Sequence, residues 1–134
     1  MEVADNSYCF VCGQNNPLGF KAAIDVDSEQ QSACCTVTIP AEFQGWKEMV
    51  HGGIISALLD EVCAHAGMTV NENIVTGELT TRFRRPVPVG REVAASARVI
   101  EQVRRTIKVE AKITLEGELM ASAVAKMVVI RSQP

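Results

Sequence analysis

The sequence has little basic charge and no long apolar run. Lys and Arg total 13 against 16 Asp and Glu, which leaves a formal net charge of -3. Because no basic excess exists to neutralise phosphates, nucleic acid is not expected to be the main partner. No apolar run approaches the roughly 20 residues needed to span a bilayer, so no membrane partner is expected either.

Signals for export and for a second domain are also missing. The N-terminal sequence MEVADNSYCF has no basic start followed by an apolar stretch, so it does not read as a secretory signal. The chain has five cysteines, an odd number, and together with this start they favour reduced thiols in the cytoplasm. No repeat, low-complexity tract or linker divides the 134 residues. We therefore predict one domain over residues 1–134, with an irregular segment over 1–17.

What the sequence does contain is a strand-rich pattern around one long apolar helix. The helix is predicted over residues 50–68, VHGGIISALLDEVCAHAGM. Apolar stretches separated by turn residues predict six strands, near residues 20–27, 32–40, 75–84, 92–101, 105–115 and 119–130. A helix that is apolar on most faces must be covered on most faces. We therefore expect an α+β fold in which a curved six-stranded antiparallel sheet wraps around one long central helix.

Two adjacent carboxylates interrupt the apolar helix. Asp60 follows Gly52 and Ser56 at intervals of about one turn, so these three residues share a stripe, and Glu61 is rotated from it by about 100°. The flanking positions are nearly all apolar, which leaves little room for a solvated face around Asp60. A carboxylate against apolar walls is costly unless a partner compensates for the lost water. The pattern therefore favours a functional Asp60 over a carboxylate on a wet face.

The start of the helix offers a complementary group. His51, Gly52 and Gly53 form its predicted first turn, where backbone N–H groups lack internal partners and the helix dipole is positive. Glycine lets a ligand oxygen approach these N–H groups, as in an oxyanion hole. Gly52 and Asp60 are about 12 Å apart along the helix axis, too far to act on one carbonyl carbon. If they act together, Asp60 must come from a second subunit, which predicts a two-fold homodimer with shared active sites.

Three stretches carry a family resemblance: CFVCGQNNPLGF, FQGWKEMVHGGIISALLDE and VTGELTTRFRRPVPVG. Over residues 9–130 the chain resembles the hot-dog-fold acyl-CoA thioesterases of the phenylacetate-pathway and thioesterase-superfamily type. The resemblance implies a hot-dog fold, in which two subunits join their sheets into one and dimers often pair into homotetramers. Its most specific part is the joint spacing of the HGG turn, the helix Asp, the Thr after the helix and the basic strand end.

The resemblance also implies roles for residues of this chain. Asp60 corresponds to the family's helix carboxylate, which acts as nucleophile or as general base for water. The oxyanion-binding N–H corresponds to Gly52 or Gly53, and Thr76 corresponds to the residue that orients the water or the carboxylate. Many relatives carry Asn or another residue after the helix Asp, whereas Glu61 here gives two adjacent carboxylates. Helical phase and spacing favour Asp60 as the working one.

Further residues are candidates for binding the substrate. Where the resemblance implies a polar amide near the thioester, this chain has Gln44, and Gly45 fits the same place. Arg82, Arg84 and Arg85 form a short basic cluster in an otherwise acidic chain. Guanidinium groups bind phosphates well, and coenzyme A carries several phosphate charges. A solvated strand end is the alternative that the residues alone leave open.

The cysteines are not expected to bind metal or to act in catalysis. Cys9 and Cys12 form one CxxC pair, but a structural zinc site usually has a second pair of similar spacing, and none follows. We therefore expect buried thiols or a turn element there, and no metal or other cofactor. Cys63 and His65 diverge by about 200° on the helix, which argues against a thiol–imidazole dyad. His51 is a candidate general base, but capping or shaping the helix start is favoured.

Two classes of function fit these residues. The first is hydrolysis of an acyl-CoA thioester to a free acid and coenzyme A, with Asp60 from one subunit and the helix N-terminus of the other. The alternative enzyme is a hot-dog dehydratase or hydratase on acyl-CoA or acyl carrier protein, using His51 and Glu61 of the partner subunit. The second class is a non-catalytic acyl-CoA-binding module, which would need no buried carboxylate. The sequence does not select the acyl chain.

Overall fold

The computed structural model describes residues 3–131, and the predictions for residues 1–2 and 132–134 lie outside the described residues. Within these residues the helix α1 (Gly52–Gly67) follows a short 3-10 turn, η1 (Ala41–Phe43). The strands are β1 (Asp25–Asp27), β2 (Ser32–Thr38), β3 (Ile74–Phe83), β4 (Glu92–Val103), β5 (Thr106–Leu115) and β6 (Glu118–Val129). No helix in this part of the chain is long and apolar enough to cross a membrane.

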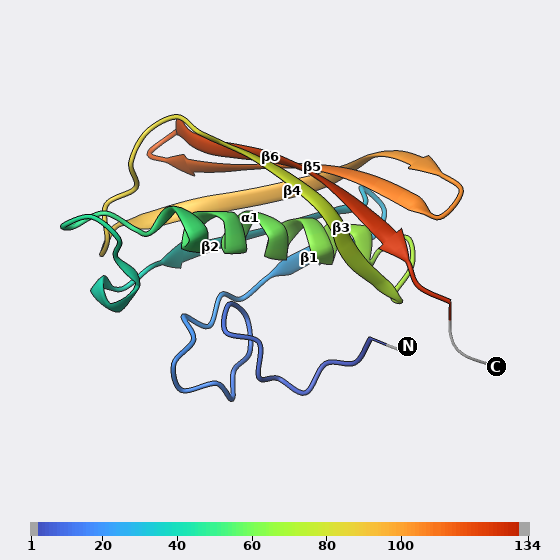
Figure 1. The fold of residues 1–134 in the computed structure, drawn as a ribbon, viewed down its shortest axis with the longest axis horizontal. Helices are drawn as coiled ribbons and strands as arrows, with labels where there is room; N and C mark the ends of the chain where they lie inside the picture. Colours follow the sequence, from blue (N-terminus) through green and yellow to red (C-terminus); the bar gives the residue numbers. More distant parts are fainter. Residues whose placement is uncertain (1–2, 132–134) are drawn as a thin grey trace.

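The six strands form one antiparallel sheet in the order β1-β2-β4-β5-β6-β3. The helix α1 lies along one face of this curved sheet, and the N-terminal segment lies on the opposite side of the helix (Figure 1). This arrangement confirms the predicted α+β hot-dog fold, with one long helix against six antiparallel strands. The strands β1 and β3 are the two edges of the sheet, and β3 is the edge that matters for the candidate site.

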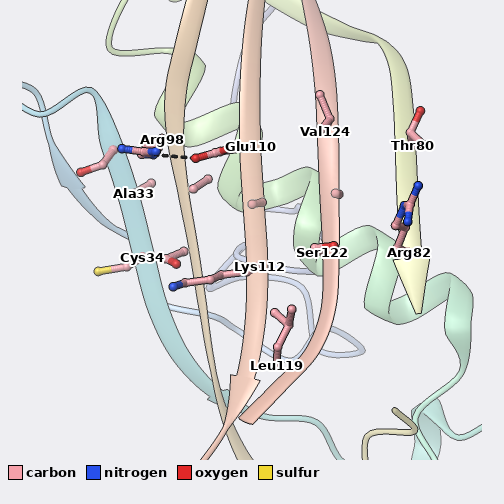
Figure 2. Close-up of a pocket in the computed structure, with 15 residues that line it drawn as sticks. Ala33, Cys34, Thr80, Arg82, Arg98, Glu110, Lys112, Leu119, Ser122 and Val124 are labelled. Atoms are coloured by element: carbon pink, nitrogen blue, oxygen red, sulfur yellow. Dashed lines mark hydrogen bonds and ion pairs between the residues drawn. The ribbon is translucent and has the colours of Figure 1, made fainter. Parts of the chain in front are cut away.

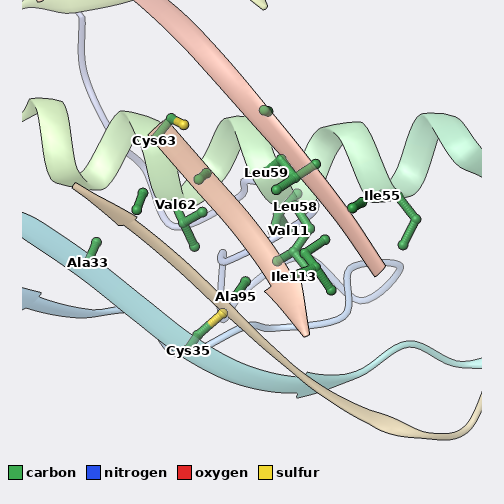
Figure 3. Close-up of a cluster of buried hydrophobic side chains, with 14 of the residues drawn as sticks. Val11, Ala33, Cys35, Ile55, Leu58, Leu59, Val62, Cys63, Ala95 and Ile113 are labelled. Atoms are coloured by element: carbon green, nitrogen blue, oxygen red, sulfur yellow. The ribbon is translucent and has the colours of Figure 1, made fainter. Parts of the chain in front are cut away.

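The core lies between α1 and the sheet face that meets it (Figure 3). Leu58, Leu59 and Val62 of α1 are fully buried, and so is Ile113 of β5. Burial alternates along β5, whose buried residues are Ile107, Val109, Ala111 and Ile113, while Leu115 on the same face is only partly buried. Burial of each large aliphatic side chain contributes about 1.5–3 kcal/mol. The apolar face of α1 therefore supplies much of the energy that holds the helix on the sheet.

The first strand is shorter than predicted, because residues 20–24 lie outside β1. The backbone N–H groups of Phe20 and Ala22 donate hydrogen bonds to the carbonyl oxygens of Phe10 and Val11. This stretch therefore pairs with the N-terminal loop and not with the sheet. Val11 is 3% exposed and belongs to the core, so the irregular N-terminal segment packs onto the rest of the protein.

Candidate active site

The predicted stripe on α1 faces the edge strand β3. Ser56 Oγ donates a hydrogen bond to Thr81 Oγ1 over 3.4 Å. One turn earlier on the helix, a Cβ atom on Gly52 would lie 3.5 Å from the ring of Phe83. Asp60, one turn later, meets the beginning of the same strand, because α1 and β3 run in opposite directions here. The stripe therefore lies along a seam between the helix and the edge of the sheet.

Asp60 and Thr76 are in direct contact in this seam. The Thr76 hydroxyl donates a hydrogen bond to Asp60 Oδ1 over 2.6 Å. The Asp60 side chain is half-buried, and no described residue donates to its second oxygen, Oδ2. A short bond from a hydroxyl group to a carboxylate fixes the orientation of the carboxylate. The structure thus brings together two of the predicted site residues and leaves one carboxylate oxygen free to act on a ligand.

A β-bulge turns Thr76 toward the helix. Thr81 faces α1, as its bond to Ser56 shows. Counting back along the strand in steps of two would put Gly77, and not Thr76, on the helix side. The pairing of β3 with β6 shifts by one residue between Thr76 and Glu78, so Gly77 is an extra residue in the strand. Bulges re-aim side chains in this way, and here the bulge points the Thr76 hydroxyl at α1.

The helix start has one backbone donor in use and one free. His51 Nδ1 accepts a hydrogen bond from the N–H of Gly53 over 2.8 Å and so caps α1. A neutral imidazole that accepts at Nδ1 carries its proton on Nε2. The N–H of Gly52 has no hydrogen-bond partner among residues 3–131. Gly52 is exposed and lines a cavity of about 440 Å³, so it is the glycine whose N–H can meet a substrate oxygen.

The loop before α1 brings Gly45 to this cavity. A Cβ atom on Gly45 would lie 3.1 Å from His51 Cα, and Gly45 lines the cavity together with Gly52. Gln44 is exposed, and its Oε1 accepts the backbone N–H of Glu48 over 3.1 Å. The carbonyl group of Gln44 is therefore engaged in holding its own loop, and its amide nitrogen is the group left for a ligand.

The three arginines have different surroundings. Arg82 lies on the sheet face away from α1, where it lines a hollow of about 710 Å³ together with Lys112 (Figure 2). The strand β3 ends at Phe83, so Arg84 and Arg85 lie outside it. Arg85 forms an ion pair with Glu118 over 2.6 Å, and both side chains are exposed. Arg82 is therefore on the opposite side of the sheet from the helix N-terminus.

Glu61 turns away from the Asp60 stripe and meets two cysteines and a histidine. Cys9 Sγ and Cys12 Sγ lie 3.4 Å and 3.2 Å from Glu61 Oε1, and His65 Nε2 lies 3.7 Å from it. Burial raises the pKa of the Glu61 carboxyl, but the neighbouring His65, Cys12 and Cys9 groups outweigh burial and hold this pKa below its usual range. Sequence reasoning missed this cluster. The available signal was the Glu-x-x-x-His spacing, which puts Glu61 and His65 on one face of a helix.

The other cysteines are separate from this cluster. Cys63 is fully buried in the core, where burial raises the pKa of its thiol to about 12. No hydrogen bond joins Cys63 to His65 in the described part of the chain. Cys34 and Cys35 point to opposite faces of β2, one exposed and one buried, as strand geometry predicts.

Comparisons with known proteins show the family and the fold of this chain. The sequence profile described as the thioesterase superfamily matches residues 48–121, a range that contains Gly52, Asp60 and Thr76. No curated protein matches the chain. A crystal structure of a thioesterase superfamily protein is similar with a TM-score of 0.84 and 27% identity, covering 91% of this chain but only 63% of that protein's length.

Two further solved structures carry names from phenylacetic acid degradation. A phenylacetic acid degradation-related protein from Ralstonia eutropha JMP134 has a TM-score of 0.75 and 26% identity, covering 82% of this chain and 86% of that one. The PaaI protein from the phenylacetic acid degradation operon of E. coli has a TM-score of 0.73 and 26% identity, covering 82% of this chain and 81% of that one. These similarities extend over most of the sheet and the helix.

Proposed function

Since this chain belongs to the thioesterase superfamily, we propose that it hydrolyses an acyl-CoA thioester to a free acid and coenzyme A. Membership of this family supports thioesterase activity in general. That the thioester is an acyl-CoA is our proposal. The observation that carries it is the Asp60–Thr76 pair, a half-buried carboxylate held by a hydroxyl group over 2.6 Å. The exposed N–H of Gly52 at the start of the same helix supplies the complementary donor.

The reaction needs a nucleophile at the carbonyl carbon and a donor at the carbonyl oxygen. The Gly52 N–H donates to the thioester oxygen, and the positive end of the helix dipole stabilises the negative charge that develops there. Asp60 either attacks the carbonyl carbon or takes a proton from an attacking water, while Thr76 holds the carboxylate in place. The C–S bond then breaks, the thiolate of coenzyme A takes up a proton, and water supplies the second oxygen of the acid. These steps need no metal or other cofactor.

Each active site is proposed to lie between two subunits. Gly52 and Asp60 are separated by about 12 Å along α1, so one helix cannot place both on one thioester. The strand β3 is a long edge strand whose outer backbone groups have no partner strand among the described residues. Pairing β3 with its copy around a two-fold axis would continue the sheet and set the two helices antiparallel. Gly52 would then face Asp60 of the partner subunit.

The proposal also includes the residues that bind coenzyme A, the oligomeric state and the cellular compartment. Arg82 and Arg84 bind phosphates of coenzyme A, and Gln44 or Gly45 lies near the thioester. The homodimer is the active unit, and two dimers pair into a homotetramer, as the family resemblance implies. The cytoplasm is the proposed location, because all five cysteines are free thiols.

Two observations argue against the alternative functions. A hydratase would use Glu61, but this carboxylate already accepts contacts from Cys9, Cys12 and His65 on another face of α1. A non-catalytic binding module would not need a hydroxyl group aimed at Asp60 by a strand bulge.

A panel of acyl-CoA thioesters tests the proposal. Short, medium, aromatic and hydroxylated acyl-CoAs are incubated with the protein, and free coenzyme A is detected with a thiol reagent. We expect turnover of at least one acyl group by the wild type and almost none by Asp60→Asn. Binding of acyl-CoA without thiol release by the folded wild type would instead favour the binding module. Hydration of an α,β-unsaturated acyl-CoA without thiol release would favour the hydratase.

A further inference from the structure

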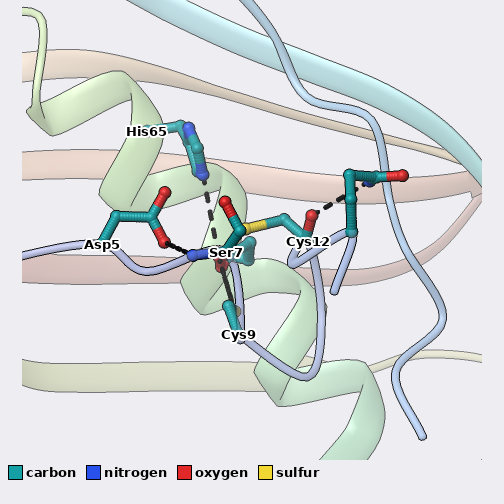
Figure 4. Close-up of polar contacts among 7 residues, drawn as sticks. Asp5, Ser7, Cys9, Cys12 and His65 are labelled. Atoms are coloured by element: carbon teal, nitrogen blue, oxygen red, sulfur yellow. Dashed lines mark hydrogen bonds and ion pairs between the residues drawn. The ribbon is translucent and has the colours of Figure 1, made fainter. Parts of the chain in front are cut away.

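A second group of reactive side chains lies on α1, apart from the Asp60 stripe. Cys9 and Cys12 come from the N-terminal segment, while Glu61 and His65 come from the helix, and all four are half-buried. The two sulfur atoms and a Glu61 oxygen lie within 4.8 Å of one another. Figure 4 shows Cys9 and Cys12 on the loop against α1, with His65 reaching toward them from the helix.

The distances from Glu61 Oε1 to the two sulfur atoms match those between ligands of one tetrahedral metal ion. With Zn–S bonds of about 2.3 Å and Zn–O bonds of about 2.0 Å, a tetrahedral angle puts sulfur and oxygen about 3.5 Å apart. Cys9 Sγ and Cys12 Sγ lie 3.4 Å and 3.2 Å from Glu61 Oε1. His65 Nε2 lies 3.7 Å from the same oxygen, against about 3.3 Å for nitrogen and oxygen bound to one zinc ion. His65 lies outside the set of ligand atoms that are all within 4.8 Å of one another, so its imidazole has to move closer to the two sulfur atoms to complete the coordination.

The loop that carries the two thiols is tightly built. The Gly13 N–H donates a hydrogen bond to the Cys9 carbonyl oxygen over 2.8 Å and closes a turn around the CxxC pair. A Cβ atom on Gly13 would lie 2.4 Å from Cys9 N and 2.6 Å from the Ser7 carbonyl oxygen, so the turn has no room for a side chain. Val11, between the two cysteines, is buried in the core. The turn therefore holds Cys9 and Cys12 against α1.

We propose that Cys9, Cys12, Glu61 and His65 form a structural zinc site that fastens the N-terminal segment to α1. Two ligands from a CxxC turn and two ligands one helical turn apart resemble the plan of many structural zinc sites. Two thiolates and an imidazole suit Zn²⁺ and disfavour Mg²⁺ and Ca²⁺, which prefer oxygen ligands. Four protein ligands leave no open position, so the ion supports the fold and does not act on substrate. The site is independent of the proposed thioesterase activity.

The metal content of the full chain tests the site. The protein is purified under reducing conditions without chelator, and we expect one zinc ion per chain by elemental mass spectrometry. Metal-free protein titrated with Co²⁺ should develop thiolate-to-cobalt charge-transfer absorption and the strong visible bands of tetrahedral cobalt, and Zn²⁺ should abolish both. Adding Zn²⁺ at about 100 times its Kd should raise the Tm by roughly 5–15 °C.

Substitutions assign the ligands. Cys12→Ser and His65→Gln should each weaken zinc binding by at least about 10-fold. Cys34→Ser removes an exposed thiol on β2 and is the matched control, which should keep full zinc content. Circular dichroism shows whether each variant is folded. If a variant does not fold, the zinc content and cobalt spectrum of the wild type still show whether the site binds metal. The proposal is overturned if folded, reduced wild type takes up neither Zn²⁺ nor Co²⁺, or if folded Cys12→Ser binds zinc as tightly as wild type.

Discussion

Asp60 and Glu61 are neighbouring carboxylates of α1 that have different partners. Thr76 donates to Asp60, whereas Cys9 and Cys12 approach Glu61. We expect Asp60→Asn to lower kcat by at least about 10²-fold, because the variant lacks the positioned base or nucleophile. Glu61→Gln should lower kcat much less, when measured on folded protein by thiol release. Equal losses in the two variants would contradict the assignment of Asp60.

The Thr76 hydroxyl provides a graded test of the same site. Loss of a hydrogen bond to a charged group costs about 1.5–3 kcal/mol, which corresponds to about 10–100-fold in rate if the bond is needed in the transition state. We therefore expect Thr76→Val to lower kcat by that factor, with a smaller change in KM. Thr80→Val is the matched control, because Thr80 lies on the same strand and lines the hollow on the other sheet face. An unchanged kcat in Thr76→Val would remove Thr76 from the mechanism.

The thiols differ in exposure, which predicts their reactivity. Burial raises the pKa of Cys35 to about 11 and that of Cys63 to about 12. A raised pKa means that little thiolate is present near pH 8, so both should react slowly with a disulfide reagent in the folded protein. Cys34 is exposed and should react fast. Cys34→Ser should therefore remove one fast-reacting thiol, and Cys63→Ala should remove none. A fast phase that survives Cys34→Ser unchanged would show that another thiol is the accessible one.

At this scale the sequence could indicate Asp60 and Thr76 but not the surroundings of Glu61. The helical period separates Asp60 from Glu61 by about 100°, and the family resemblance points to Thr76. The contact of Cys12 with Glu61 spans 49 residues and depends on how an irregular loop crosses α1. Loop paths follow from turn hydrogen bonds and from the burial of single residues such as Val11, which no periodic pattern encodes.

The bulge in β3 is the local structure that aims Thr76 at the helix. A Cβ atom on Gly77 would lie 2.8 Å from Val128 Cγ2, so a side chain there would force Val128 or the backbone around it to shift. We expect Gly77→Ala to lower the free energy of unfolding by about 1–3 kcal/mol. A displacement of Thr76 of about 1 Å should also lower kcat by about 10-fold or more. Denaturant unfolding and thiol-release kinetics measure the two effects.

Val128 offers the matched rescue for this variant. Val128→Ala removes the methyl groups that a side chain at residue 77 would meet. The double variant Gly77→Ala with Val128→Ala should therefore recover both stability and kcat relative to Gly77→Ala. Val128→Ala alone should leave kcat near the wild-type value, because this side chain is on β6 and partly exposed. If the double variant is no better than Gly77→Ala, the effect at residue 77 does not come from this clash.

The basic end of β3 is proposed to bind the phosphates of coenzyme A. Replacing Arg82 and Arg84 with Ala should raise KM for acyl-CoA and leave kcat nearly unchanged, because such contacts are equal in ground and transition states. The salt dependence of KM should also weaken, since salt screens exposed charges. An acyl-pantetheine thioester, which lacks the phosphates, should show no change in KM. An unchanged KM for full acyl-CoA would leave the cluster as a solvated strand end.

The order and type of the elements could be predicted better than their ends. Five of the six strands and the helix are close to the predicted ranges, because the periodicity of a long alternating or apolar stretch identifies the type of element. The first strand was predicted over residues 20–27, but the structure has only Asp25–Asp27. The apolar residues of 20–24 pack with the N-terminal loop, and alternation alone cannot tell this from pairing with a sheet. The bulge at Gly77 was also not predicted, since a single glycine in a strand has several possible causes.

The whole molecule has an edge strand that leaves its candidate site open on one side. The strand β3 is ten residues long, mostly exposed, and bears the exposed apolar residues Val75 and Phe83. Long exposed edge strands are normally covered or paired. The seam that holds Gly52 and Asp60 lies beside this edge. A second subunit that pairs along β3 would therefore cover the edge and complete the site at the same time.

Subunit mixing tests whether each site is shared. Asp60→Asn removes the carboxylate, and Gly52→Leu covers the free N–H with a side chain whose Cβ atom makes only ordinary contact at 3.5 Å with Phe83. Each variant alone should be nearly inactive. In a mixed dimer, one site carries both defects and the other carries neither, so activity should rise toward half the wild-type rate per mixed dimer. If each site instead lay within one chain, every site in the mixed dimer would carry one of the two defects, and mixing would restore no activity. Subunits carrying tags of different size show whether exchange has occurred. If tagged heterodimers form and remain inactive, the active site is not shared between subunits. The separation of about 12 Å between Gly52 and Asp60, eight residues along the helix, would then need another explanation.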